Sequence, residues 1–287
     1  MVFHKYFIYF LTLVASAIWL SVFSVGANLH VIACDVGQGD AILIQRINTQ
    51  ILIDSGPNDS VLNCLGKYMP FWDRTIELAI LTHPDKDHSG GYLNVFKTYK
   101  IKNFLTNDLN NKLFSSQYIE LLRNEVGGRG TEVIYPDIGM GIRVSLIYLD
   151  ILHPSQDFQS SKTNNYSIVN ILKYGNFKAI FTGDIEDVVS DLVSTRPELG
   201  EVNYIKVPHH GSKNGLSEKL LQAIKPKVAV ISVGRKNSYG HPHKEVLDLL
   251  RSSSAIEKYK LKILRTDEIG DVEIISDSQT FWTKNEK

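Results

Sequence analysis

The sequence predicts an α/β fold whose apolar strands end at a common rim of metal-binding side chains. Segments with the residue patterns of strands and of helices follow one another along most of the chain. One histidine after a strand would mean little, but several such strand ends indicate that the ends converge on a single site. Separate apolar segments lead into His83, Asp184, His209 and His241.

The composition is that of an ordinary globular protein. The chain has 287 residues, of which 43% are hydrophobic and 22% charged, enough for one large domain or two coupled halves. Lysine and arginine together number 31, as do aspartate and glutamate. A net charge of zero excludes a protein that coats nucleic acid or an anionic membrane through its overall charge, so any polyanion must bind locally.

Residues 1–27 are predicted to be a signal peptide or an N-terminal membrane anchor. Residues 6–27 carry no charge and are mostly apolar, after a short start that contains Lys5. The small residues Val25–Ala27 suit cleavage by a signal peptidase, whereas the length of the apolar run also suits a bilayer span. Under both alternatives residues 28–287 are expected to work outside the cytoplasmic membrane, either secreted or anchored.

The two cysteines, Cys34 and Cys64, are too few for a disulfide framework or a thiolate metal site. A single disulfide bond between them is one of two alternatives. We expect instead two small, unpaired core residues, because free cysteine is among the residue types most often buried.

Several strands and a helix are predicted before the central motif, and the last of these strands is the apolar run Glu77–Ile80. The strand Gln50–Asp54 ends in a carboxylate at the predicted rim. Asp54 is expected either to orient a ligand histidine or to cap the following turn. The other elements predicted here are a hairpin of the strands Leu29–Val36 and Ala41–Gln45, and a helix from Ser60 to Met69.

The segment Leu81–Gly91 is the centre of the predicted site. In an extended loop His83 and Asp85, two residues apart, point the same way. The adjacent Asp87 and His88 diverge, so this short segment can supply ligands to two ions. Imidazole and carboxylate are ligands of zinc-like sites.

The middle of the chain contains one long polar loop. We expect a mobile flap or an internal boundary at residues 155–165. His153 stands directly before a proline, and we expect a structural role for it. The elements predicted around the loop are helices at 91–99 and 115–126 and strands at 102–106, 131–135 and 143–152.

The second half of the chain repeats the pattern of apolar strands followed by ligand-type residues. Residues 178–181 lead into Thr182–Asp184, where the glycine leaves room and the single carboxylate can bridge two cations. Two further apolar segments, 204–207 and 228–233, lead to His209, His210, His241 and His243.

This ligand set predicts metal-assisted hydrolysis. Two divalent ions held by such a rim would lower the pKa of a bridging water and provide hydroxide near neutral pH. The sequence has no Gly-rich dinucleotide fingerprint, phosphate-binding P-loop or serine nucleophile elbow that would indicate another chemistry.

These motifs resemble those of the metallo-β-lactamase superfamily. Over roughly residues 29–280 the chain is similar to the C-terminal hydrolase domain of ComEC-type competence proteins. The resemblance implies an αββα sandwich of two mixed sheets with outer helices, as one hydrolase domain over residues 28–287. The segments that carry it are Asp35–Ala41, Ile53–Gly56, His83–Gly91, His209–Ser212 and Tyr239–His243.

The resemblance also implies roles for individual residues and a cofactor of two divalent ions, zinc or manganese. The metal ligands would be His83 and Asp85 for one ion, Asp87, His88 and His210 for the other, and Asp184 as the bridge. The catalytic residues, facing the scissile group, would be His209, His241 and Ser212. Each of the histidines at 209, 210 and 241 is an alternative for completing the second metal site.

Two features depart from the family pattern. Asp85 stands where most of the superfamily has histidine, and residues 164–167 stand where it has a further histidine ligand. The first metal site is therefore richer in oxygen, which admits Mn²⁺ as well as Zn²⁺. ComEC proteins also carry a DNA-transport membrane domain, whereas here we find one apolar segment and expect no DNA channel.

The resemblance favours hydrolysis of phosphodiester bonds in DNA or in a small phosphodiester. A β-lactam, or another ester or amide, is the alternative substrate, because the same hydroxide attacks carbonyl carbon. The alternative from another class of function is a metal-stabilised module that binds DNA or another ligand without turnover. The cations expected either to hold phosphate or to be solvated loop charges are Lys206, Lys213, Arg235, Lys236 and Lys244.

Overall fold

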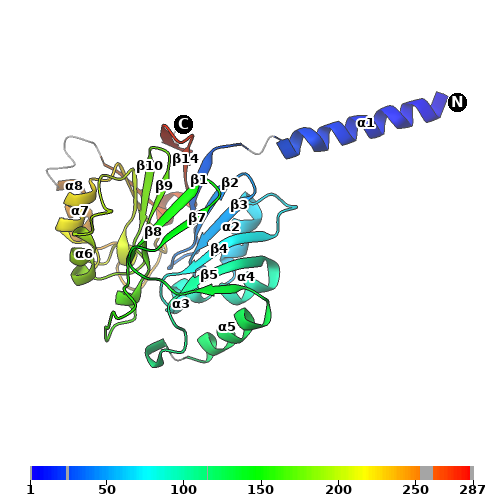
Figure 1. Cartoon of the computed structure of the whole chain (residues 1–287). Coiled ribbons are helices and arrows are strands. Elements are labelled where there is room, and N and C mark those ends of the chain that lie inside the picture. The colour runs from blue at the N-terminus through cyan, green and yellow to red at the C-terminus, as the bar shows by residue number, and fades with distance from the viewer. Residues whose placement is uncertain (1, 24–25, 115, 253–260, 285–287) are drawn as a thin grey trace.

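The computed structural model of the chain describes residues 2–23, 26–114, 116–252 and 261–284, and in it the strands form two mixed sheets (Figure 1). The first sheet has the spatial order β15 (Phe281–Thr283), β14 (Val272–Ser276), β1 (Leu29–Ala33), β2 (Ile42–Arg46), β3 (Thr49–Ile53), β4 (Thr75–Leu81), β5 (Lys100–Thr106) and β6 (Glu132–Ile134). The second has the order β13 (Lys262–Arg265), β12 (Val228–Ile231), β11 (Tyr204–Lys206), β10 (Phe177–Phe181), β9 (Val169–Tyr174), β8 (Ile147–His153) and β7 (Gly141–Val144).

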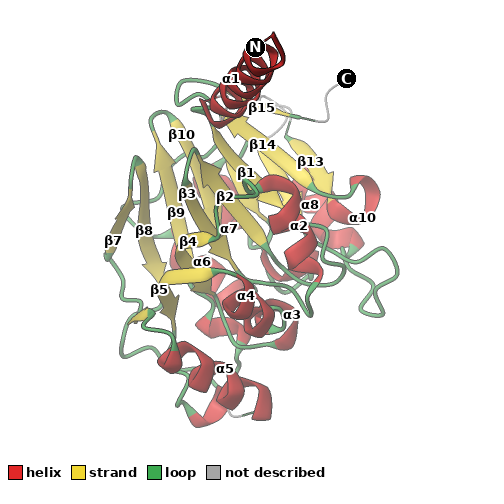
Figure 2. Ribbon diagram, turned by 90° about the vertical axis from the view of Figure 1, so that its right-hand side faces the viewer, coloured by secondary structure: helices red, strands yellow, loops and turns green. Residues whose placement is uncertain are grey.

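Helices cover the outer face of each sheet. The first sheet is covered by α2 (Ser60–Tyr68), α4 (Tyr92–Thr98) and α5 (Gln117–Gly128), and the second by α6 (Asp187–Ser194), α7 (Glu218–Ile224) and α8 (Lys244–Ser252). Figure 2 shows α2 and α4 in front of the strands. The remaining helices are short: α3 (Lys86–Ser89), α10 (Thr266–Ile269), and the 3₁₀ turns η1 (Lys112–Phe114), η2 (Asn164–Tyr166) and η3 (Pro208–Gly211).

Three apolar clusters define the layers. The cluster between the two sheets joins side chains such as Val31 of β1 and Phe181 of β10. Their neighbours in the same strands point the other way: Ile32, after Val31, and Ile180, before Phe181, pack against the outer helices. Strands with two buried faces explain why the sequence shows long apolar runs in place of alternation. The predicted αββα sandwich is confirmed.

The hydrogen-bond pattern brings the strand ends to one rim. Strands β3 to β6 are parallel to one another, as are β10 to β13, so within each set the carboxyl ends lie at the same edge. The predicted hairpin of β1 and β2 is antiparallel, with His30 opposite Gln45. The loop between β8 and β9 connects two neighbouring antiparallel strands of one sheet, so residues 155–165 do not separate two sheets.

The prediction of one strand over residues 143–152 is wrong in one respect. The structure divides it into β7 and β8, which pair as a hairpin with Val144 opposite Ile147. Ser145 takes a positive φ of 58° in the turn. The sequence has no glycine, asparagine or proline at this turn, and the apolar pattern therefore suggested one continuous strand.

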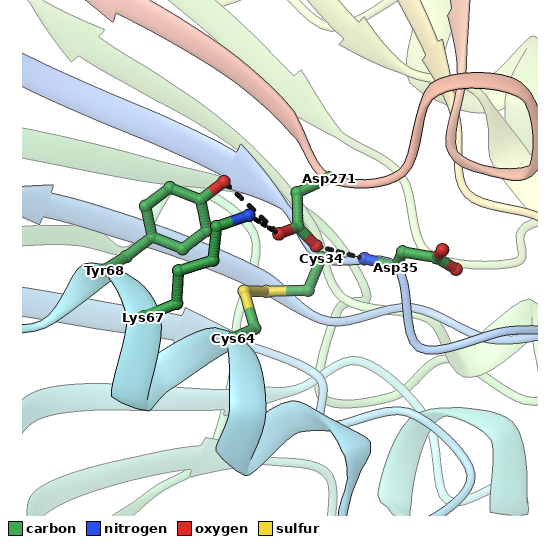
Figure 3. The surroundings of a disulfide bond; sticks show 6 residues. All are labelled: Cys34, Asp35, Cys64, Lys67, Tyr68 and Asp271. Carbon is green, nitrogen blue, oxygen red and sulfur yellow. Dashed lines mark hydrogen bonds and ion pairs between the residues drawn. A yellow bond between two sulfur atoms is a disulfide. The ribbon is translucent and has the colours of Figure 1, made fainter.

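The expectation of two unpaired cysteines is also wrong, because Cys34 and Cys64 form a disulfide bond (Figure 3). Cys34 directly follows β1, and Cys64 lies on the buried face of α2, which packs against the same sheet. Their Cα atoms are 5.9 Å apart, within the range that a disulfide spans. Both residues are buried as expected, but the sequence did not reveal that the helix face and the strand end meet.

The N-terminal helix α1 (Val2–Phe23) projects away from the two sheets (Figures 1 and 2). Several of its apolar side chains are exposed, among them Phe7, Phe10 and Leu13. Within the described residues, no helix combines the length and the apolar character needed to cross a membrane. A signal peptide or anchor at residues 1–27 stays a prediction.

Candidate metal centre

Four buried or half-buried side chains meet at the predicted rim. Asp87 and His88 come from α3, just after β4, while Asp184 follows β10 and His210 lies in η3 after β11. Each offers one ligand atom, and these atoms all lie within 4.8 Å of one another. The Oδ2 atom of Asp184 is 3.3 Å from Nε2 of His88 and 3.3 Å from Nε2 of His210. This set matches the second metal site predicted above, together with its bridging carboxylate.

The residues predicted for the first ion lie beside this cluster. The Nε2 atom of His83 is 3.8 Å from Oδ2 of Asp85. The ring centroid of His83 is 4.1 Å from that of His88, so the two imidazoles are neighbours. Thr163 donates a hydrogen bond of 3.1 Å to Oδ2 of Asp85 and thus holds it from the loop after β8.

Asp54 orients one of the ligand-type histidines. Its Oδ2 atom lies 2.8 Å from Nδ1 of His88, which leaves Nε2 directed at the cluster. The backbone N–H and the hydroxyl of Thr82 donate to the two carboxylate oxygens at 2.8 and 2.7 Å. Of the two roles predicted for Asp54, the structure shows contact with the histidine.

A second buried carboxylate, Asp40, supports His210 in a similar way. The Nδ1 atom of His210 lies 2.9 Å from the carbonyl oxygen of Ser232 and 3.4 Å from Oδ1 of Asp40. The sequence alone predicts no role for Asp40. The available signal was its place between Gly39 and a buried strand, where a carboxylate needs a partner.

The partner of Asp40 is Lys206, which corrects one prediction. Its ammonium group is buried, lies 2.8 Å from Oδ2 of Asp40, and donates to the carbonyl oxygen of Val207. Lys206 therefore does not face a substrate phosphate. Of the other predicted cations, Lys244 pairs with Asp248 and Arg235 donates to a backbone carbonyl. Lys213 and Lys236 are exposed and make no ion pair within the described ranges.

The ionisable side chains of the cluster shift one another's pKa values. Burial lowers the pKa of His83 to about 3, and the neighbouring His88 adds to the shift. Burial also acts to lower the pKa of His88, but Asp184 and Asp54 outweigh it and hold that pKa well above its usual value. Burial acts to raise the pKa of Asp184, yet His210 and His88 hold it well below its usual range. The carboxylate is ionised and calls for positive charge, from protons or from a metal cation.

The unsatisfied atoms of the cluster fit a metal ion. Among the described residues, the Nε2 atoms of His83, His88 and His210 and the Oδ1 atom of Asp184 are buried without a hydrogen-bond partner. Buried polar atoms are rarely left unpaired, and those at a functional site call for an ion or a ligand. A mixed set of imidazole and carboxylate ligands suits zinc and also manganese.

The backbone around the ligands is held in unusual conformations. Gly183 has φ of +53°, and a Cβ atom there would lie 2.8 Å from Cβ of Ser167. The hydroxyl of Ser167 accepts a hydrogen bond of 2.9 Å from the N–H of Asp184. His209 and His210 also have positive φ, at 51° and 53°. For the two histidines such conformations cost about 1–3 kcal/mol each and persist where the surroundings impose them, most often at functional sites.

The three predicted catalytic residues lie outside the four-residue cluster. The ring centroid of His241 is 5.7 Å from that of His209 and 6.4 Å from that of His210. His209 is partly exposed, and its Nε2 atom is 3.4 Å from Nδ2 of Asn164. Ser212 is buried, and its N–H donates to the carbonyl oxygen of His209. Of the three alternatives for the second metal site, the structure brings His210 into the cluster.

His153 has the structural role expected for it. The ring is fully buried and its Nε2 atom lies 2.7 Å from the carbonyl oxygen of Asn165. Phe158 packs against it in an edge-on contact. His153 therefore supports the loop between β8 and β9, at Phe158 and Asn165, and does not join the cluster.

Sequence comparison links the chain to competence and recombination proteins. It is 28% identical over 258 residues to ComE operon protein 3 of Bacillus subtilis, covering 83% of this chain and 32% of that protein. It is 31% identical over 230 residues to Recombination protein 2 of Haemophilus influenzae, covering 78% of this chain and 26% of the relative. The chain is thus related to the ComEC-type competence proteins and spans about a quarter to a third of the length of these relatives.

Solved structures share the fold. The metallo-β-lactamase fold protein YhfI from Bacillus subtilis superposes with a TM-score of 0.53 at 11% identity, covering 89% of this chain and 99% of YhfI. Tm1679, described as a metal-dependent hydrolase of the β-lactamase superfamily, gives a TM-score of 0.51 at 14% identity, covering 83% and 95% of the two chains. Residues 34–235 match the model of the metallo-β-lactamase superfamily. With its His/Asp cluster at the rim of an αββα sandwich, this chain belongs to that superfamily of metal-dependent hydrolases.

Proposed function

We propose that this protein hydrolyses phosphodiester bonds, in DNA or in a small phosphodiester, with two divalent cations. The observation that carries the proposal is the four-residue cluster around Asp184 with the pair His83–Asp85 beside it. Together these side chains offer enough nitrogen and oxygen atoms for two neighbouring ions. The phosphodiester substrate rests on the relationship to a recombination protein and to competence proteins.

The residues of the rim divide into those that hold cations and those left for a substrate. The bound cations would supply Lewis acidity and an activated water. Burial lowers the pKa of His241 to about 4, helped by the neighbouring His209, so the ring is neutral near pH 7. A neutral imidazole can donate a proton to, or accept one from, a substrate oxygen through its two nitrogens. Lys213 and Lys236, on the loops that lead from these strands, would attract the phosphate charge.

We also propose that the body works outside the cytoplasmic membrane. The disulfide between Cys34 and Cys64 supports this, because such bonds persist mainly in oxidising compartments. An N-terminal signal or anchor at residues 1–27 would deliver it there.

The proposal is tested with the purified full chain, stripped of metal and reloaded with Mn²⁺ or Zn²⁺. Three substrates are compared: single-stranded DNA, bis-p-nitrophenyl phosphate and a chromogenic β-lactam. We expect chelator-sensitive cleavage of the two phosphodiesters and loss of that cleavage in Asp184→Asn. Lys219→Met, on an exposed ion pair of α7, is the matched control and keeps full activity.

The other outcomes select the alternatives. Cleavage of the β-lactam alone would indicate a carbonyl hydrolase. Tight metal binding with no turnover of any of the three substrates would indicate a module that binds its ligand without cleaving it.

A further inference from the structure

A separate cavity of about 450 Å³ lies between the segments that follow β5 and β6 and the loop that follows β8. On the side of the first sheet it is lined by residues that follow β5 and β6, among them Asn107 and Tyr135. On the side of the second sheet it is lined by residues of the loop after β8, among them Phe158 and Gln159. None of its lining residues is assigned above to metal binding or to catalysis.

Direct hydrogen bonds connect this cavity with the metal centre. The Nδ2 group of Asn107 donates to the carbonyl oxygen of Thr82 at 3.2 Å and to that of Tyr166 at 2.9 Å. Thr82 directly precedes a predicted metal ligand, and Tyr166 lines the cavity. On its other side the same loop reaches the rim, because Thr163 donates to Asp85. The cavity and the metal centre are therefore neighbours, connected through Asn107 and through the loop after β8.

The side chains that line the cavity favour a flat, uncharged ring. Phe114 and Phe158 meet Tyr166 edge-on, with ring centroids 5.3 and 5.4 Å apart, and form an aromatic floor. Tyr135 is 50% exposed and makes no ring contact within the part of the chain that the structure describes. Its ring is thus free to stack on a ligand.

Amide groups at the cavity supply hydrogen-bonding capacity. The side chains of Gln156 and Gln159 line it, are exposed, and make no hydrogen bond among the described residues. No lysine or arginine lines the cavity, and Asp108 is its one charged lining residue within the described ranges. This charge disfavours a phosphate group, whereas amides pair well with the edges of nucleobases.

We propose that this cavity binds a nucleobase of a single-stranded nucleic acid whose phosphodiester lies at the metal centre. The inference rests on the proposed function and gives that site a substrate class. Tyr135 stacks on the base, and the amides of Gln156 and Gln159 bond to its edge. The strand must be single, because a base in a duplex is stacked and paired and cannot enter a protein pocket.

The test measures binding in the absence of turnover. The full chain is kept in chelator, and fluorescence anisotropy compares a labelled single-stranded oligonucleotide with an abasic one of the same length. We expect the intact strand to bind more tightly than the abasic strand. Tyr135→Ala should weaken binding of the intact strand by about five-fold or more, the lower range for one lost base–aromatic stack, and leave the abasic strand unchanged.

Matched variants separate stacking from a general loss of structure. Tyr135→Phe keeps the ring and should bind like the wild type, and Gln159→Ala should also weaken binding of the intact strand only. Tyr148→Ala removes an exposed tyrosine of β8 outside the cavity and should change neither strand.

The outcomes distinguish this inference from the proposed function. Hydrolysis of bis-p-nitrophenyl phosphate, which has no base, reports on the proposed function alone. Equal binding of intact and abasic strands, binding of neither, or Tyr135→Ala behaving as wild type would overturn the nucleobase site even if the small diester is hydrolysed. Base-dependent binding without hydrolysis would retain the cavity and refute the phosphodiesterase.

Discussion

The ammonium group of Lys206 lies 2.8 Å from Oδ2 of Asp40, in a buried ion pair on the side of His210 that faces away from Asp184. Burial acts to raise the pKa of Asp40, but Lys206 and His210 outweigh it and hold that pKa well below its usual range. The carboxylate is therefore ionised. Together with the carbonyl oxygen of Ser232 it lies on the Nδ1 side of the imidazole, which leaves Nε2 for a metal. A lysine in β11 thus supports the rim from within the sandwich.

Removing this lysine should destabilise the fold strongly. Lys206→Met leaves Asp40 buried without its cation, which typically costs about 3–5 kcal/mol in the free energy of unfolding. Urea unfolding of the metal-free chain measures the change. The double variant Asp40→Asn/Lys206→Met removes both charges and should recover part of the loss. A single variant as stable as the wild type would show that the pair does not stabilise the fold.

The contact between Asp54 and His88 should set metal affinity. Asp54→Asn keeps the shape but loses the negative charge that orients the imidazole, and loss of such a partner typically lowers metal affinity about 10–100-fold. Competition with a chromophoric chelator measures the affinity for Zn²⁺. Asp59→Asn, an exposed aspartate at the start of α2, is the matched control. Unchanged affinity in Asp54→Asn would argue against this role.

The disulfide should contribute substantially to stability. It closes a loop with a sequence separation of 30 residues. Constraining a loop of this size in the unfolded chain is worth about 3–4 kcal/mol. Cys34→Ala/Cys64→Ala should lose that amount in urea unfolding, and reduction should destabilise the wild type but leave the double variant unchanged. A wild type insensitive to reduction under unfolding conditions would contradict the bond.

Asp271, beside the disulfide, should make stability depend on acidic pH (Figure 3). Burial acts to raise its pKa, but hydrogen bonds from Lys67 and from the N–H of Asp35 outweigh it, so the pKa of the folded state is lowered. A carboxyl group whose pKa is lowered in the folded state stabilises the fold at pH values above its pKa in the unfolded chain, about 3.9. This stabilisation is lost as the pH falls below that value and through the pKa of the folded state.

The check is unfolding of wild type and Asp271→Asn across the acidic range. The wild type should be more stable at pH 6, and the difference should shrink as the pH falls through about 4 towards 2. Asp59→Asn, an exposed aspartate at the opposite end of α2 from Lys67, serves as the control, because its side chain makes no capping hydrogen bond. A difference that stays constant with pH would refute the assignment.

Much of this architecture could be predicted because it follows from local patterns. The apolar strands before His83, Asp184 and His210 are visible as runs, and parallel strands bring their ends together. The pair Asp40–Lys206 could not be predicted, because its two charges lie 166 positions apart in the sequence and pack only when both sheets have formed. Lysine is also rarely buried.

The disulfide and the β7–β8 hairpin could not be predicted from the sequence, for different reasons. Cys64 pairs with Cys34 because α2 turns that face onto the first sheet, and helix register on a sheet is a tertiary property. Ser145 adopts a conformation that glycine or asparagine usually takes, so its turn carried no sequence signal.

Metal content measured by mass spectrometry tests the central claim most directly. The stripped chain is equilibrated with Zn²⁺ or Mn²⁺, passed over a desalting column and analysed beside Asp184→Asn. We predict two ions per wild-type chain and loss of at least one in the variant, because Asp184 lies between His88 and His210. A folded wild-type chain that retains neither metal would contradict the assignment of this rim as a metal centre.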